Sequence, residues 1–141
     1  MIRCTQILSF DSAHRIIGHQ GNCKMLHGHR YTIEATFESE KLDDLGMVID
    51  FSVIKKKFND WLQDNWDHNA ILSIKDKELG EKIASSTGQK ICYIDANPTA
   101  ENMAHHLLYN VCPVIFQNHQ VKCVKIKLYE TPNCYVTAKL T

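Results

Sequence analysis

The sequence has no long apolar run, no excess of either charge and no closely spaced cysteine pair. No stretch approaches the roughly 18 apolar residues that a membrane-spanning helix requires, and residues 1–10 do not join a charged segment to an apolar core as a secretory signal does. With 16 basic and 16 acidic residues, the chain carries no general electrostatic footprint for nucleic acid. These absences predict a protein that is not secreted and whose partners are neither a membrane nor nucleic acid.

The six cysteines are scattered along the chain and include no CxxC pair. They are Cys4, Cys23, Cys92, Cys112, Cys123 and Cys134. Most of them lie within alternating apolar segments. This distribution favours reduced thiols in a cytoplasmic protein over a disulfide framework.

The chain of 141 residues is predicted to form a single domain, residues 1–141, because this length buries roughly 70% of the unfolded surface in one core. Alternating apolar residues predict strands, and apolar stripes at helical spacing predict helices. The expected elements, in chain order, are strands at 5–10 and 27–38, a helix after Asp50, an irregular segment at 73–89, a short strand at 90–94, a helix after Thr99, and a closing hairpin of strands at 123–130 and 136–140.

Asp50 and Thr99 are predicted to be the N-caps of the two helices, because each precedes an apolar stripe. The stripes are Phe51, Ile54, Phe58, Trp61 and Leu62 in the first helix, and Met103, Leu107, Val111 and Ile115 in the second. His105 and His106 are read as surface residues of the second helix. The segment 73–89 is polar and charged, so we expect a mobile excursion with at most a short helical turn.

The stretch Cys23–His29 is the strongest candidate for a site. His27 and His29 are two residues apart in a predicted strand and therefore point to the same, apolar face. His14 follows the first predicted strand and can supply a third imidazole. Three neutral imidazoles suit zinc, and a site with three protein ligands keeps its fourth position for water or substrate. The spacing is equally consistent with Cys23 as a fourth ligand that closes a structural zinc site.

Glu130 falls on the apolar face of its predicted strand, where a carboxylate is unfavourable unless it is paired. It therefore indicates either a salt bridge at the strand end or an anchor for a ring edge that presents two N–H groups. The adjacent Asp67 and His68 follow the first helix. A carboxylate beside an imidazole fixes the tautomer of the ring and raises its basicity, although surface residues are the simpler interpretation of this dipeptide.

Six motifs, in this order, resemble the family of 6-pyruvoyltetrahydropterin and 6-carboxytetrahydropterin synthases. They are Phe10-Asp11-Ser12-Ala13-His14-Arg15, Cys23 with His27-Gly28-His29, Gly46-Met47-Val48-Ile49-Asp50-Phe51, Asp67-His68, Pro98-Thr99-Ala100-Glu101-Asn102 and Tyr129-Glu130-Thr131. The resemblance implies an α+β tunnelling fold, in which a ββααββ unit with an antiparallel sheet and two helices on one face oligomerises into a barrel, commonly as a hexamer.

The resemblance also implies a role for each matching residue. His14, His27 and His29 would hold a catalytic zinc ion, which leaves Cys23 as a catalytic thiol. His68 and Asp67 would act as relay partners of that thiol across a subunit boundary. Glu130 would clamp the pterin ring, and Thr99 and Glu101 would line the same pocket.

The implied substrate is 7,8-dihydroneopterin triphosphate. Three residues separate Cys23 from His27, a short spacer that resembles the bacterial 6-carboxytetrahydropterin synthases of the queuosine route. A 6-pyruvoyltetrahydropterin synthase and a non-catalytic zinc or pterin-binding module are the alternatives. Arg15, Lys24 and Arg30 flank the motifs, and the sequence singles out none of them as a triphosphate ligand.

Overall fold

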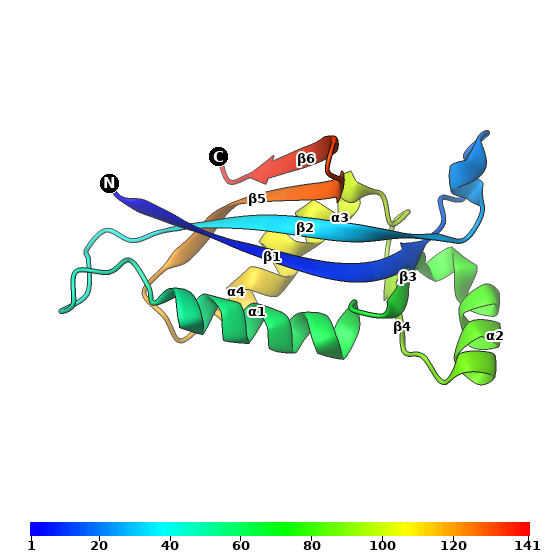
Figure 1. Ribbon diagram of the computed structural model, residues 1–141, viewed down its shortest axis with the longest axis horizontal. Coiled ribbons are helices and arrows are strands. Elements are labelled where there is room, and N and C mark those ends of the chain that lie inside the picture. Colours follow the sequence, from blue (N-terminus) through cyan, green and yellow to red (C-terminus); the bar gives the residue numbers. More distant parts are fainter.

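The computed structural model describes residues 1–141, and its longest feature is an antiparallel ladder of two 12-residue strands. β1 (Arg3–His14) pairs with β2 (His27–Glu38) over its whole length, from Arg3 opposite Glu38 to His14 opposite His27. The ladder runs across the molecule in Figure 1, with the N-terminus at its left end. Alternation along both strands sends every second side chain into the core, as the sequence predicts.

Four further strands extend the ladder into a six-stranded sheet of order β4-β3-β1-β2-β5-β6. These strands are β3 (Asn69–Ser73), β4 (Ile91–Ile94), β5 (Lys122–Thr131) and β6 (Cys134–Lys139). The hairpin of β5 and β6 is antiparallel to its neighbours, as predicted. β3 and β4 join in parallel, so the sheet is mixed and not purely antiparallel as predicted.

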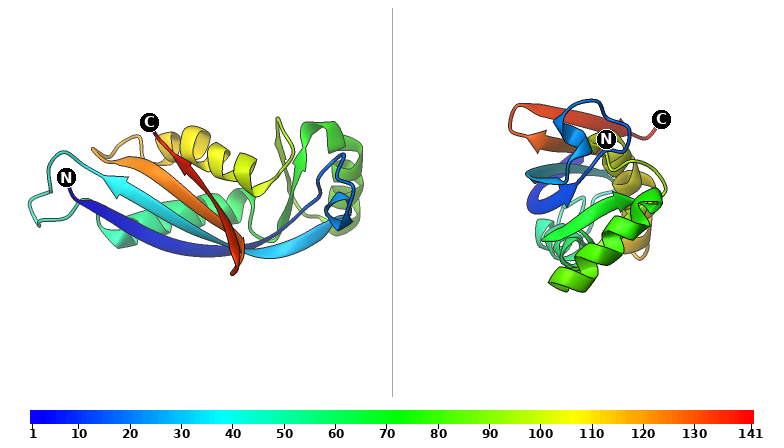
Figure 2. Two further views of the ribbon diagram at one scale, coloured as in Figure 1. Left: turned by 90° about the horizontal axis from the view of Figure 1, so that it is seen from above. Right: turned by 90° about the vertical axis from the view of Figure 1, so that its right-hand side faces the viewer.

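Three helical segments cover one face of the curved sheet and leave the other face bare (Figure 2). They are α1 (Phe51–Asn65), α3 (Ala100–His106) and α4 (Cys112–Ile115), with a π-helical stretch Leu107–Val111 joining the last two. Both predicted N-caps are confirmed. Asp50 accepts a hydrogen bond from Ser52 N at 2.8 Å, and Thr99 Oγ1 accepts one from Asn102 N at 3.1 Å.

The predicted irregular segment is wrong, because residues 77–87 form a third helix, α2 (Lys77–Thr87). Its buried face is narrow, and Gly80 is its only fully buried residue. A Cβ atom on Gly80 would lie 1.9 Å from Tyr93 Oη, so the helix packs against β4 through a glycine. Gly88 ends the helix in the left-handed conformation, with φ of 76°.

The core lies between the sheet and its helices and contains 25 buried residues. Phe10 of β1 stacks on Tyr31 of β2 at 5.0 Å between ring centroids, and Trp66 lies 5.7 Å from Phe10. His106 was expected at the surface, but it is half-buried with its ring 6.0 Å from that of Trp66. Packing along β1 and β2 therefore holds the inward positions in register up to the end of the ladder.

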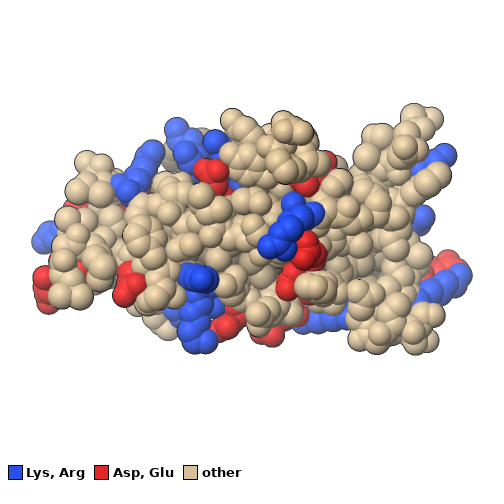
Figure 3. All heavy atoms as spheres, viewed as in Figure 1, with Lys and Arg blue, Asp and Glu red and all other residues tan.

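Uncharged residues cover most of the face seen in Figure 3, and a basic group lies beside an acidic group just right of its centre. Ile7 of β1 points to the bare face of the sheet and is 59% exposed.

All six cysteines are free thiols. None of the helices has the length and apolar content needed to cross a membrane.

Candidate functional site

Three imidazoles gather at one end of the β1–β2 ladder. His14 is the last residue of β1 and lies opposite His27, while His29 lies opposite Ser12. One donor nitrogen from each ring lies within 4.8 Å of the other two, so the group can hold a metal ion. The sequence therefore located this cluster correctly, because strand alternation sends His27 and His29 to the same inward face.

The hydrogen bonds of these rings leave their remaining nitrogens facing one another. His14 Nδ1 donates to Pro98 O at 2.7 Å, and His27 Nδ1 donates to Met25 O at 2.7 Å. In a neutral ring each Nε2 then carries a lone pair, and these two atoms are 3.1 Å apart. His29 Nε2 is buried without a hydrogen-bond partner. A cation between the three nitrogens satisfies all of them at once.

Burial sets the protonation states around the cluster. His14 is 2% exposed, and burial lowers the pKa of His14 and of His29, which favours the neutral rings that metals bind. Burial, with the nearby carboxylate of Glu130, raises the pKa of Tyr31 above its ordinary value. Its hydroxyl, 3.2 Å from His14 Nδ1, therefore stays protonated.

Glu130 comes from β5 to face the imidazoles, at a point where the pairing of β5 with β6 is irregular. Its Oε1 atom lies 3.5 Å from His14 Nε2 and 3.8 Å from His29 Nε2. The side chain is 30% exposed and can also meet a ligand from solvent. The inward placement of this carboxylate follows from the strand alternation that the sequence shows.

A hollow of about 300 Å³ lies beside the imidazoles and the carboxylate. Its lining includes five of the predicted site residues, namely His14, Cys23, Thr99, Glu101 and Glu130. Cys23 lies in a 3-10 turn, Asn22–Lys24, and its carbonyl accepts a hydrogen bond from Ile16 N at 2.8 Å. Its thiol does not belong to the cluster of close metal donors, which the three imidazoles form by themselves.

The predicted relay pair lies elsewhere in the chain. His68 Nδ1 is 3.1 Å from Asp67 Oδ2, and Asp67 Oδ1 accepts a hydrogen bond from Asp11 N at 3.0 Å. His68 N donates to Asp11 O at 2.7 Å and holds His68 at a φ of 59°. His68 lines a second, open hollow of about 380 Å³ together with Arg30 and with His29 of the imidazole group. Within one chain the structure does not bring Cys23 and His68 into the same hollow.

Two of the three flanking basic residues are already paired. Arg15 forms a two-point ion pair with the buried carboxylate of Asp76, with Arg15 Nε 2.7 Å from Asp76 Oδ2. Arg30 contacts Asp11 Oδ2 at 3.0 Å. Lys24 is exposed.

Six of the eleven residues that line the hollow were not predicted as site residues, and three of these six, His19, Cys134 and Tyr135, carry side chains that can form hydrogen bonds. His19 precedes Cys23 by four positions in the same loop, which was the only available signal. Cys134 and Tyr135 open β6, next to the predicted turn.

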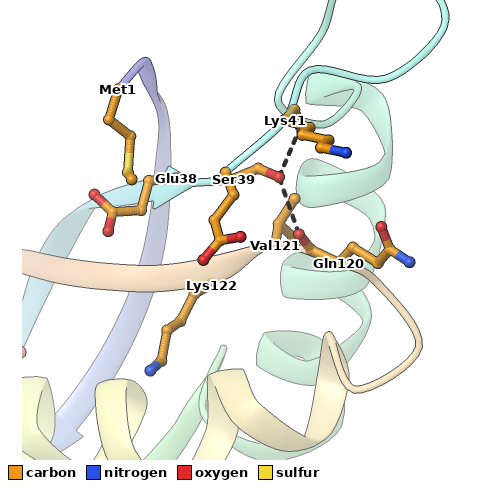
Figure 4. A pocket seen from close by; sticks show the side chains of 8 residues that line it. Met1, Glu38, Ser39, Lys41, Gln120, Val121 and Lys122 are labelled. Carbon is orange, nitrogen blue, oxygen red and sulfur yellow. Dashed lines mark hydrogen bonds between the residues drawn. The ribbon is translucent and has the colours of Figure 1, made fainter.

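A larger hollow, of about 830 Å³, lies at the opposite end of the ladder and contains none of the predicted site residues. Met1, Glu38, Lys41 and Lys122 are among its lining residues (Figure 4). Ser39 Oγ donates there to Lys41 O at 2.8 Å and to Gln120 O at 3.1 Å. These partners join the loop after β2 to the start of β5.

Comparisons with known proteins agree with one another. A model of the family described as 6-pyruvoyl tetrahydropterin synthase matches residues 3–140. The chain is 51% identical over 136 residues to a protein of Rickettsia bellii named 6-carboxy-5,6,7,8-tetrahydropterin synthase, and the match covers 96% of this chain and 99% of that protein.

Solved structures share the fold. The crystal structure of an uncharacterized protein from Wolinella succinogenes superposes with a TM-score of 0.80 at 20% identity, and the match covers 99% of this chain and 98% of that one. The 6-pyruvoyl tetrahydropterin synthase of Caenorhabditis elegans superposes with a TM-score of 0.70 at 23% identity, covering 99% and 96% of the two chains. These superpositions confirm the predicted fold class.

Proposed function

Because this chain belongs to the 6-pyruvoyl tetrahydropterin synthase family, we propose that it is a zinc-dependent lyase that converts 7,8-dihydroneopterin triphosphate and water to 6-carboxy-5,6,7,8-tetrahydropterin, acetaldehyde and triphosphate. The product would enter the 7-deazaguanine and queuosine precursor pathway. The name of the relative at 51% identity supports the 6-carboxy branch. The observation that carries the proposal is the group of three imidazoles next to the hollow that Cys23 and Glu130 line.

His14, His27 and His29 are the proposed zinc ligands. Their fit to the ion rests on the facing Nε2 atoms of His14 and His27 and on the buried, unpartnered Nε2 of His29. Three neutral imidazoles are a common donor set for catalytic zinc. When bound, zinc supplies Lewis-acid chemistry that acidifies the hydroxyl-bearing side chain of the substrate.

Glu130 is the proposed anchor of the pterin ring. A carboxylate accepts two parallel N–H bonds, and the pterin ring edge presents such a pair of donors. Thr99 and Glu101 line the same hollow and are proposed to contact the ring as well. Thr99 is also the N-cap of α3, so one hydroxyl group would serve both the helix and the ligand.

Cys23 is proposed to move protons at the substrate side chain, with His68 and Asp67 as its relay. The thiol lies in the hollow, and a nearby cation favours its thiolate form. The Asp67 carboxylate, 3.1 Å from His68 Nδ1, would orient the imidazole ring and fix its tautomer. These groups would return a proton to the pterin ring of the substrate while triphosphate leaves.

The relay would be completed by a neighbouring copy, because Cys23 and His68 line different hollows of one chain. We therefore propose a trimer-based assembly, in its common form a homohexamer, with active sites at subunit boundaries. The helix-free sheet face with its exposed Ile7 supports an assembly through the sheets. Residues 1–141 would act as a single domain in this assembly. The six free thiols support a cytoplasmic location.

The test is mass spectrometry of the pterins formed when zinc-loaded protein meets 7,8-dihydroneopterin triphosphate. We expect 6-carboxytetrahydropterin from the wild type and none from Cys23→Ala, with zinc retained in the variant. Cys134→Ala is the matched control, because it removes the other thiol of the same hollow. This control should keep the activity.

Other outcomes assign other functions. A 6-pyruvoyl product would place the chain in the other branch of the family. Loss of zinc from Cys23→Ala would make Cys23 a structural ligand. Ligand binding by the wild type without turnover would indicate a binding module.

A further inference from the structure

His19 lies in the loop between β1 and β2 and lines the hollow that contains Cys23 and Glu130. The loop is closed at its base by the hydrogen bond from Ile16 N to Cys23 O at 2.8 Å. His19 N donates in turn to Ile16 O at 3.4 Å. The same short loop therefore places both a thiol and an imidazole at the hollow.

The ring of His19 is held through one nitrogen only. Its Nδ1 accepts a hydrogen bond from Gly21 N at 2.9 Å, which places the ring proton of the neutral form on Nε2. A Cβ atom on Gly21 would lie 3.1 Å from His19 Cε1, so the close approach of this edge of the ring to the backbone depends on the glycine. Nε2–H, on the opposite edge, remains free to donate to a ligand.

The lining of this hollow contains no lysine and no arginine. Its charged carboxylates, Glu101 and Glu130, do not favour an anionic ligand. Arg15 is committed to Asp76, and Arg30 lines the second hollow with His68. Among the lining residues outside the proposed zinc cluster, His19 alone has a nitrogen donor in its side chain, and a phosphate chain requires hydrogen-bond donors.

We propose that His19 Nε2–H donates a hydrogen bond to a phosphate oxygen of the substrate, which makes His19 a substrate-binding residue that selects the phosphorylated pterin. The inference rests on the proposed function, because it assumes a pterin triphosphate in this hollow. It assigns to His19 a part in binding the phosphate chain and none in binding the pterin ring.

The experiment compares two fluorescent, fully oxidised analogues, neopterin and neopterin triphosphate, by titration into zinc-loaded protein. For His19→Leu we expect the Kd of neopterin triphosphate to rise about tenfold, equal to about 1.4 kcal/mol, with the Kd of neopterin unchanged. His19→Gln, whose amide nitrogen can take the place of Nε2–H, should recover part of the loss. Gly21→Ala, which displaces the ring, should weaken neopterin triphosphate binding in the same direction.

His105→Gln is the matched control, because His105 is exposed on α3 and outside the hollow. Equal loss of both ligands in His19→Leu, or no loss of either, would overturn the role of His19 and leave the proposed function standing. A wild-type protein that binds neither analogue would contradict the proposed function, and the His19 assignment with it.

Discussion

The two ends of the β1–β2 ladder have the same antiparallel backbone pairing, but their side chains form different kinds of contact. At one end, Arg3 and Glu38 form an exposed ion pair at 2.8 Å beside the hollow of about 830 Å³. At the other end, His14 and His27 bring two nitrogens within 3.1 Å of each other beside a hollow of about 300 Å³. The one buried side-chain atom without a hydrogen-bond partner, His29 Nε2, belongs to the imidazole group at this second end.

The difference shows why size is a poor guide to function in this fold. Arg3 and Glu38 satisfy each other, and an exposed pair of this kind contributes only about 0–1 kcal/mol. The buried Nε2 atom of His29 has no hydrogen-bond partner. A buried polar group without a hydrogen-bond partner destabilises a fold, so its presence at one end of a well-packed ladder supports the metal site proposed above.

The largest expected effect comes from removing one imidazole. His29→Ala should lose zinc and reduce turnover by at least about 100-fold, because two remaining imidazoles form an incomplete site. Arg3→Ala, the matched change at the opposite end of the ladder, should keep both. Metal content by inductively coupled plasma mass spectrometry, measured with turnover, checks the contrast. Full zinc occupancy in His29→Ala would contradict the three-histidine site.

The second prediction concerns Glu130, whose substitution should change the affinity for the pterin without changing the zinc content. Glu130→Gln should keep zinc and weaken pterin binding roughly 10- to 100-fold, because the amide presents one acceptor where the carboxylate presents two charged ones. Fluorescence titration with neopterin, together with metal analysis, gives both readouts. Glu38→Gln, at the far end of the ladder, is the control. Unchanged affinity in Glu130→Gln would remove Glu130 from the pterin site.

The site end of the ladder was predictable because its signal is local. Strand alternation places His27 and His29 on one face with no knowledge of the rest of the fold, and it places Glu130 inward by the same rule. The caps at Asp50 and Thr99 are equally local, since each depends on the first turn of its own helix.

The rest depends on distant packing and was not predictable in the same way. β3 pairs with β1 through only three residues, 69–71, and no local pattern encodes a parallel contact with a strand so far away in the sequence. α2 carries few large apolar residues, so its polar composition resembles that of a loop. Its packing against β4 depends on the close contact between Gly80 and Tyr93, which only the folded structure shows. The separation of Cys23 from His68 is likewise a property of the assembled sheet.

A third prediction uses the two caps, of which only Thr99 lines the hollow of the proposed active site. Thr99→Ala and Asp50→Ala should each lower the free energy of unfolding by about 1 kcal/mol, because each leaves a helix N-terminus without its side-chain acceptor. Only Thr99→Ala should also weaken pterin binding. Urea unfolding and pterin titration of both variants test this. Equal effects of both variants on binding would mean that Thr99 acts only through its helix.

We expect the smallest effect from a substitution of Lys122, which lines the hollow of about 830 Å³. Lys122 lies opposite Glu38 in the pairing of β5 with β2 and is exposed, so Lys122→Ala removes a charge that water already solvates. The free energy of unfolding should change by no more than about 0.5 kcal/mol, and zinc content and turnover should stay at wild-type values. Chemical unfolding and the pterin assay check this. A loss of turnover in Lys122→Ala would give the far end of the ladder a part in function that its satisfied, exposed side chains do not predict.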